Sequence, residues 1–246
     1  MKKYEQSGVA MTCRGMEEYR RMFALTDGLL AAGEILDVAA GASSFVADAT
    51  RSGYRAVAAD PRYGLPPGEW LAEAAGEIGV SSRKIAALAD IYDWSFYGDP
   101  AHHRLMREAS LARFAEDIAS PDALERYVPG GLPELPFASD RFDLVLCSHF
   151  LFLYGEQFGE HFHERSLLEL LRVCKPGGEI RIYPLVDLAW KPYPGLDGLI
   201  ERIVRQGASA ERLPSQLPFI PHSDRLLRIV KGGVHDSHCI LTEETL

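Results

Sequence analysis

Two aspartates near the start of the chain occupy positions that suit ligand binding. Asp37 lies in a short apolar run, residues 34–39, and a turn of small residues at 40–44 follows it. Asp60 directly follows a second apolar run at 54–59. An acid at the end of the second strand of a βαβ unit can accept hydrogen bonds from ribose hydroxyls, and small turn residues let backbone N–H groups approach a ligand. The pattern predicts a site for an adenosine-containing cofactor, and a βαβ unit that binds nothing is the alternative.

Two residues further along the chain are candidates for proton transfer. His149 follows a third apolar run at 142–147, at the carboxyl edge of the expected sheet, where ligands of such folds bind. The ordinary pKa of imidazole suits a general base, although a loop histidine that is only hydrogen-bonded fits the pattern equally well. Tyr154, in the segment HFLFLY, is a second candidate, for which packing is the better explanation.

Strand and helix patterns alternate along the chain, which favours a parallel sheet with helices on both faces. Leu167, Leu170, Leu171 and Cys174 recur at the spacing of a helix packed on a sheet, and Lys-Pro-Gly-Gly at 175–178 ends that helix. Further helices are expected at 45–52 and 195–206, and further strands at 179–183, about 211–219 and 225–230.

The segment between Asp60 and Tyr127 is mainly helical and is longer than a crossover needs. Asp99 and Pro100 are typical of a helix start. One face of that helix is expected to comprise Leu105, Ala109, Ala112, Ala115 and Ile118. The preceding aromatic residues, Tyr92, Trp94, Phe96 and Tyr97, suit either the core of this segment or a pocket wall.

These elements predict a single domain, residues 1–246, with a doubly wound α/β fold. The expected sheet has seven mostly parallel strands and ends in a C-terminal antiparallel hairpin. The predicted domain also contains an N-terminal helical cap at 1–32 and a helical insertion or lid at about 65–126. The N-terminal segment through Tyr19 and Met22 is expected to close a pocket together with the insertion.

Four motifs occur in an order that resembles the class I S-adenosylmethionine (SAM) dependent methyltransferases. They are ILDVAAGASSF, the pair Ala59-Asp60, LPELPFASDRFDLVLCS and LLELLRVCKPGGEIRIYPL. The resemblance covers about residues 33–65 and 127–185. It implies a Rossmann-like methyltransferase with SAM as cofactor and S-adenosylhomocysteine (SAH) as product.

The resemblance also implies roles for individual residues. Asp37 would lie beneath the methionine part of SAM, and Asp60, followed by Pro61, would bind the ribose hydroxyls. Ser148 and His149 would face the transferred methyl group. The remaining implied cofactor contacts are Ala39, Gly41 and Ala42 at the close-approach turn and Leu132 near the adenine.

Three positions depart from the family pattern. Ala39 and Ser43 stand where glycine is usual, and Gly131 stands where an acid often contacts adenine. Because the methyl group of alanine restricts φ, we expect the turn to have a geometry that alanine tolerates. The departures favour one alternative, a degenerate SAM-binding protein with a regulatory or scaffolding role. A dinucleotide-dependent oxidoreductase is a second alternative, but no Y-x-x-x-K motif is present.

The composition of the chain argues against several classes of binding partner. The net charge of −9, with no basic cluster, argues against a nucleic-acid surface. No apolar stretch of about 18 residues suggests a membrane span, so a cytoplasmic protein is expected. The four cysteines lack a C-x-x-C pair, and the histidine groups near 102, 161 and 235 lack metal-site spacing, so buried thiols and no metal are expected.

The predicted reaction is methyl transfer from SAM to a small-molecule acceptor. Residues 147–150, Cys-Ser-His-Phe, lack the acidic or amide, Pro-Pro-aromatic signature of many amino-directed methyltransferases. This makes nucleic-acid bases and amide nitrogens less favoured acceptors. The acceptor and the oligomeric state stay open at this point.

Overall fold

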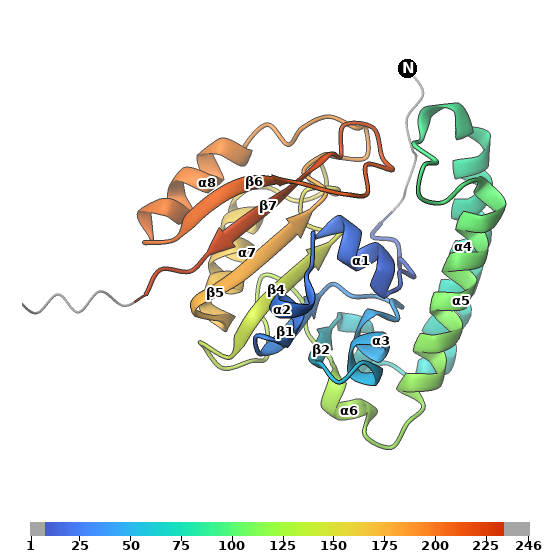
Figure 1. The fold of residues 1–246 in the computed structure, drawn as a ribbon, viewed down its shortest axis with the longest axis horizontal. Coiled ribbons are helices and arrows are strands. Elements are labelled where there is room, and N and C mark those ends of the chain that lie inside the picture. The colour runs from blue at the N-terminus through green and yellow to red at the C-terminus, as the bar shows by residue number, and fades with distance from the viewer. Residues whose placement is uncertain (1–7, 234–246) are drawn as a thin grey trace, which may run out of the picture.

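The computed structural model describes residues 8–233 and contains a seven-stranded sheet (Figure 1). The strand order is β3-β2-β1-β4-β5-β7-β6. All neighbours from β3 to β5 pair in parallel, whereas β7 runs antiparallel to both β5 and β6. The strands are β1 (Glu34–Val38), β2 (Arg55–Ala59), β3 (Tyr127–Val128), β4 (Phe142–Ser148), β5 (Cys174–Tyr183), β6 (Ser209–Pro214) and β7 (Arg225–Val230).

Helices cover both faces of this sheet. Helices α1 and α3 lie on one face, with the long helices α4 and α5 side by side beyond them, and α7 and α8 lie on the other (Figure 1). The α-helices are α1 (Met16–Met22), α2 (Asp27–Ala31), α3 (Phe45–Arg51), α4 (Pro67–Ala87), α5 (Pro100–Ile118), α6 (Ala123–Arg126), α7 (Glu160–Val173) and α8 (Leu196–Arg205). Two short 3₁₀ helices, Pro61–Gly64 and Ala89–Ile91, flank α4.

The central strands bury both of their faces because successive side chains point to opposite sides. Ile35 of β1 and Leu144 of β4 pack into the cluster beneath α1 and α3. Their neighbours Leu36 and Val145 pack into the cluster beneath α7 and α8. The doubly wound α/β fold with an antiparallel C-terminal end is thereby confirmed.

Helix α5 starts as predicted, because the side chain of Asp99 accepts a hydrogen bond from the backbone N–H of His102. The predicted apolar face is wrong: Leu105 is 60% exposed. The buried positions are instead His103, Arg107, Ser110 and Phe114. These polar side chains are buried because they find hydrogen-bond partners on neighbouring elements, a property that an apolar pattern does not reveal.

Three other boundaries differ from the sequence prediction. Helix α7 ends at Val173, and Cys174 opens β5 instead of closing the helix. Strand β6 begins and ends earlier than the predicted 211–219. The two-residue strand β3 had no periodic pattern to mark it, since it is too short for alternation to show.

Candidate active site

A cavity of about 150 Å³ opens at the carboxyl ends of β1, β2 and β4. This is the edge where ligands bind in open α/β sheets. The cavity is lined by Val9, Ala10, Met11, Thr12, Ala39, Gly41, Asp60, Pro61, Arg62, Gly131, Leu132, Ser148, His149 and Phe150. Six of the eight residues that the resemblance assigned to the cofactor are among them, while Asp37 and Ala42 are buried outside the lining.

Asp60, which follows β2, is hydrogen-bonded to the turn after β1. One carboxylate oxygen accepts the backbone N–H of Gly41 at 3.0 Å, and the other accepts that of Arg62 at 3.0 Å. Burial raises the pKa of Asp60, against these two hydrogen bonds and the Arg62 guanidinium. A carboxylate accepts about four hydrogen bonds, so capacity for two ligand hydroxyls remains.

Asp37 is fully buried next to this cavity. Its Oδ2 accepts a hydrogen bond from the Tyr19 hydroxyl at 2.9 Å, and its Oδ1 has no hydrogen-bond partner among residues 8–233. Burial raises the pKa of Asp37 to about 8, the charge of Asp60 adds to the rise, and the Tyr19 hydroxyl opposes it. A positively charged ligand beside this carboxyl group would lower its pKa and stabilise the carboxylate.

The turn after β1 contains a strained alanine. Ala39 has a φ of +57°, and Gly41 has a φ of +56°. The expectation of a turn geometry that alanine tolerates is thus wrong, since the left-handed region is disfavoured for any residue with a Cβ atom. The Ala39 N–H is held by the carbonyl oxygen of Ala59 at 2.9 Å.

Ser43, the second departure from the family turn, anchors the N-terminal segment. Its hydroxyl donates to the carbonyl oxygen of Arg14 at 2.6 Å, and the Ser44 N–H donates to the same oxygen at 3.0 Å. A glycine at position 43 would lack the first of these bonds. The serine therefore fixes Arg14 beside the turn.

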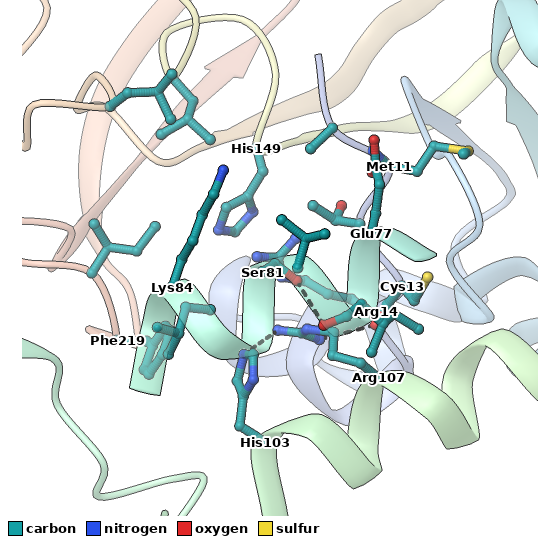
Figure 2. Close-up of a pocket in the computed structure, with 18 of the residues that line it drawn as sticks. Met11, Cys13, Arg14, Glu77, Ser81, Lys84, His103, Arg107, His149 and Phe219 are labelled. Atoms are coloured by element: carbon teal, nitrogen blue, oxygen red, sulfur yellow. Dashed lines mark hydrogen bonds between the residues drawn. The ribbon is translucent and has the colours of Figure 1, made fainter. Parts of the chain in front are cut away.

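A second, larger cavity of about 320 Å³ adjoins the first. We call it the large chamber and the cavity at the strand ends the small cavity. Helices α4 and α5, the segment 10–14 and the loops after β4, after β5 and before β7 form the walls of the large chamber (Figure 2). Four residues line both cavities: Ala10, Met11, Thr12 and His149.

His149 has an unusual backbone conformation at this junction. Its φ is +51°, its N–H donates to the carbonyl oxygen of Tyr183 at 2.7 Å, and its Nδ1 lies 3.0 Å from the hydroxyl oxygen of Ser148. Burial, and secondarily the charges of Arg14 and Arg107, lower the pKa of His149 well below its usual value. The imidazole is therefore neutral near pH 7, able to accept a proton but weakly basic.

Tyr154 lines the large chamber and holds the segment that divides the two cavities. Its hydroxyl oxygen accepts the backbone N–H of Ala10 at 2.9 Å. Glu77 of α4 accepts the next N–H, that of Met11, at 2.6 Å. Burial raises the pKa of Tyr154, so the phenol stays neutral. These two side chains fasten the segment from opposite sides.

Sequence reasoning missed the charged residues of the large chamber. Arg14, Glu77, Lys84 and Arg107 all line it, from the N-terminal segment, α4 and α5. One signal was available for α5, where His103, Arg107 and Ser110 recur at i, i+4 and i+7, the spacing of a single helix face.

Within the described residues, no group of three or more His, Cys, Asp or Glu side chains is placed to hold a metal ion. The sequence cluster His235, His238 and Cys239 lies outside the described residues. Cys13, Cys147 and Cys174 are buried and free. Across positions 8–233, every helix lacks the combination of length and apolar character that crossing a membrane requires.

Comparisons with known proteins place these observations in a family. A family model described as "Methyltransferase domain" matches residues 101–182. The uncharacterized protein MJ0045 of Methanocaldococcus jannaschii is 31% identical over 189 residues, which cover 76% of this chain and 83% of that protein. The crystal structure of the glycopeptide N-methyltransferase MtfA, complexed with SAM, has a similar fold. Its TM-score is 0.50 at 14% identity, with 89% of this chain and 88% of that one covered.

The chain thus has a Rossmann-like α/β fold with a cavity at the carboxyl edge of β1, β2 and β4. Residues 101–182 match the methyltransferase-domain family, the chain is a relative of MJ0045, and its fold is similar to that of a SAM-dependent methyltransferase.

Proposed function

We propose that this protein transfers the methyl group of SAM to a small-molecule acceptor, with the cofactor at the small cavity and the acceptor in the large chamber. The observation that carries the proposal is the shared wall: His149 and residues 10–12 line both cavities. A donor in one cavity and an acceptor in the other would both contact these four residues, so their reacting atoms would meet there. Positioning of this kind supplies most of what a methyl transfer needs.

The proposed cofactor contacts follow from the lining of the small cavity. Asp60, which keeps two hydrogen-bonding positions open, accepts the ribose hydroxyls. Pro61 and Leu132 provide apolar contacts for the adenine, in place of an acid at Gly131. Asp37, with its unpartnered Oδ1, would lie near the cationic methionine end, where the positive charge of SAM would favour the ionised carboxylate, and the backbone of Ala39 and Gly41 lies at close approach. When bound, SAM supplies a methyl group that its sulfonium has already activated.

The size of the large chamber supports a small acceptor. Its volume of about 320 Å³ lies within the range of roughly 300–1,000 Å³ that is usual for small-molecule sites. Residues of two long helices, α4 and α5, form one of its walls. A macromolecular acceptor would have to insert a side chain or a base past these helices.

His149 is the proposed general base for an acceptor that must lose a proton. It would accept that proton at the junction of the two cavities, where bound SAM would supply the activated methyl group. His149→Ala is expected to lower turnover about 100-fold and to leave SAH affinity nearly unchanged. Equal turnover in the variant would remove His149 from the mechanism.

Calorimetric titration with SAM, SAH and NAD tests the cofactor assignment. Binding of both sulfur nucleotides and no binding of NAD is expected. Incubation of the SAM complex with a panel of small acceptors, followed by measurement of SAH, then tests the acceptor class. Absence of binding of either sulfur nucleotide would contradict the proposal.

A further inference from the structure

The floor of the large chamber holds two buried arginines that share a single carboxylate. Arg107 of α5 forms an ion pair with Glu18 of α1 and donates to the carbonyl oxygen of Cys13 at 3.0 Å. The carboxylate of Glu18 also accepts the Tyr97 hydroxyl at 2.6 Å and the Gly15 N–H at 2.9 Å. Three donors therefore already bind the carboxylate of Glu18.

Arg14, the second arginine, lacks an equivalent partner. Its side chain is only 9% exposed, and its Nε lies 4.0 Å from the nearer Glu18 oxygen, beyond hydrogen-bonding distance. Its Nε and Nη1 have no hydrogen-bond acceptor in the part of the chain that the structure describes. A buried guanidinium without an acceptor is costly, because the fold has removed its hydration without replacing it.

Charged side chains of both signs surround the chamber within the part of the chain that the structure describes. Arg14, Arg107 and Lys84 line it, against Glu77 in the lining and Glu18 behind it. Figure 2 shows Arg14, Lys84 and His149 around the same space. The two arginines on one wall make this part of the chamber a site that attracts an anion.

Another part of the chamber wall is aromatic. Tyr92 and Phe219 stack with ring centroids 4.7 Å apart, and Trp190 meets Tyr92 edge to face at 6.2 Å. All three residues line the chamber. Such a wall accommodates a flat apolar body.

We propose that the methyl acceptor is a small aromatic or similarly flat carboxylic acid whose carboxylate binds to Arg14. The guanidinium matches a carboxylate in geometry as well as charge. Arg14 and His149 line the same chamber (Figure 2). An acid anchored there therefore has its reacting atom near the junction with the small cavity. This inference rests on the proposed function and specifies its acceptor.

SAM and SAH themselves carry a carboxylate, so the source of the anion must be distinguished. Arg14 lines the large chamber and does not line the small cavity, which favours the acceptor as the source. The test uses protein saturated with SAH, because the cofactor carboxylate is then already in place.

The experiment titrates SAH-saturated protein with phenylacetate and indole-3-acetate, and with the matching neutral amides, by calorimetry. In the wild type, the acids are expected to bind at least about tenfold more tightly than the amides, as a charge-assisted hydrogen bond is worth roughly 1.5–3 kcal/mol. In Arg14→Gln this preference disappears while SAH affinity changes less than about threefold. Arg14→Lys, which keeps the charge, retains part of the preference.

Arg104→Gln serves as the matched control, because Arg104 lies on the exposed side of α5, paired with Glu108, and outside the chamber lining. This variant should keep the full preference for the acids. Equal binding of acids and amides, or no binding of either, by SAH-saturated wild type would overturn the inference. A loss of SAH affinity above about tenfold in Arg14→Gln would also overturn it, since Arg14 would then bind the cofactor carboxylate. Failure of the wild type to bind SAH would instead count against the proposed function.

Discussion

The small cavity and the large chamber are neighbours, but the chain builds them in different ways. The small cavity is made mainly by residues directly after strands, such as Ala39 after β1, Asp60 after β2 and His149 after β4. The large chamber combines α4, α5, the segment 10–14 and loops near 190 and 219. Parallel strands bring their carboxyl ends together in any such sheet, whereas helical insertions follow no shared rule. The position of the proposed donor site therefore follows from the fold, whereas the position of the proposed acceptor site depends on the helices and loops particular to this chain.

The two regions also differ in how they satisfy buried charge. In the small cavity, Asp60 is held by backbone N–H groups of its own edge. In the large chamber, the side chains of Glu18, Tyr97 and Arg107 hold one another across α1, α5 and the loop before α5. The chamber floor should therefore contribute to the stability of the fold as well as to binding.

The largest effect on stability is expected when the ion pair between Arg107 and Glu18 is removed. Arg107→Met keeps the bulk of the side chain but leaves Glu18 buried without its main counter-ion. Removing one partner of a buried ion pair costs about 3–5 kcal/mol, and urea unfolding would measure the loss. The exposed pair Arg104–Glu108 provides the control, since Arg104→Met should cost at most about 0.5 kcal/mol. Equal losses in both variants would show that the buried cluster has no special role.

The second effect concerns the small cavity. Asp60→Ala removes the acceptor proposed for both ribose hydroxyls, and two hydrogen bonds to a charged group are worth about 3 kcal/mol or more, or roughly 100-fold in SAM affinity. Calorimetry measures the change. Glu73→Ala is the control, because Glu73 lies 3.8 Å from Arg62 but outside the cavity lining. Unchanged affinity in Asp60→Ala would exclude Asp60 from cofactor binding.

The third effect is a dependence of stability on pH that originates at Asp37. Burial raises its pKa to about 8 in the folded protein, whereas an unfolded aspartate has a pKa near 3.9. The folded state keeps the proton that the unfolded state releases, so this group's contribution to stability falls as pH rises from about 4 to about 8. Between about pH 6 and about pH 8 the cofactor-free wild type should lose about 2 kcal/mol that Asp37→Asn does not lose. Urea unfolding at both pH values checks this, and parallel pH profiles of the two proteins would refute the assignment.

The smallest effect tests the strained turn. Ala39→Gly relieves the left-handed strain and should stabilise the protein by about 1 kcal/mol, measured by thermal or urea unfolding. Ala42→Gly is a matched control three residues later, where φ is not positive. That change should destabilise the protein by roughly 0.5–1 kcal/mol. If both variants were destabilised alike, Ala39 would carry no strain.

The difference between the two regions also explains what could be predicted from the sequence. The apolar runs at β1, β2 and β4 mark buried strands, and residues at their ends follow from the geometry of a parallel sheet. The inward face of α5 was predicted incorrectly because its buried positions, His103 and Arg107, carry polar side chains. Their burial depends on partners far away in the chain, such as Glu18, and no local pattern encodes such pairing. The positive φ of Ala39 was also out of reach, because only tertiary contacts force an alanine into that region.

The central claim is that donor and acceptor occupy separate cavities that meet at His149. A crystal structure of the protein with SAH bound tests it most directly. The account predicts that the ribose hydroxyls lie within hydrogen-bonding distance of Asp60, that the sulfur faces His149, and that the large chamber is left free of the nucleoside. A nucleoside lying in the large chamber, against the aromatic residues Tyr92 and Phe219, would contradict the account.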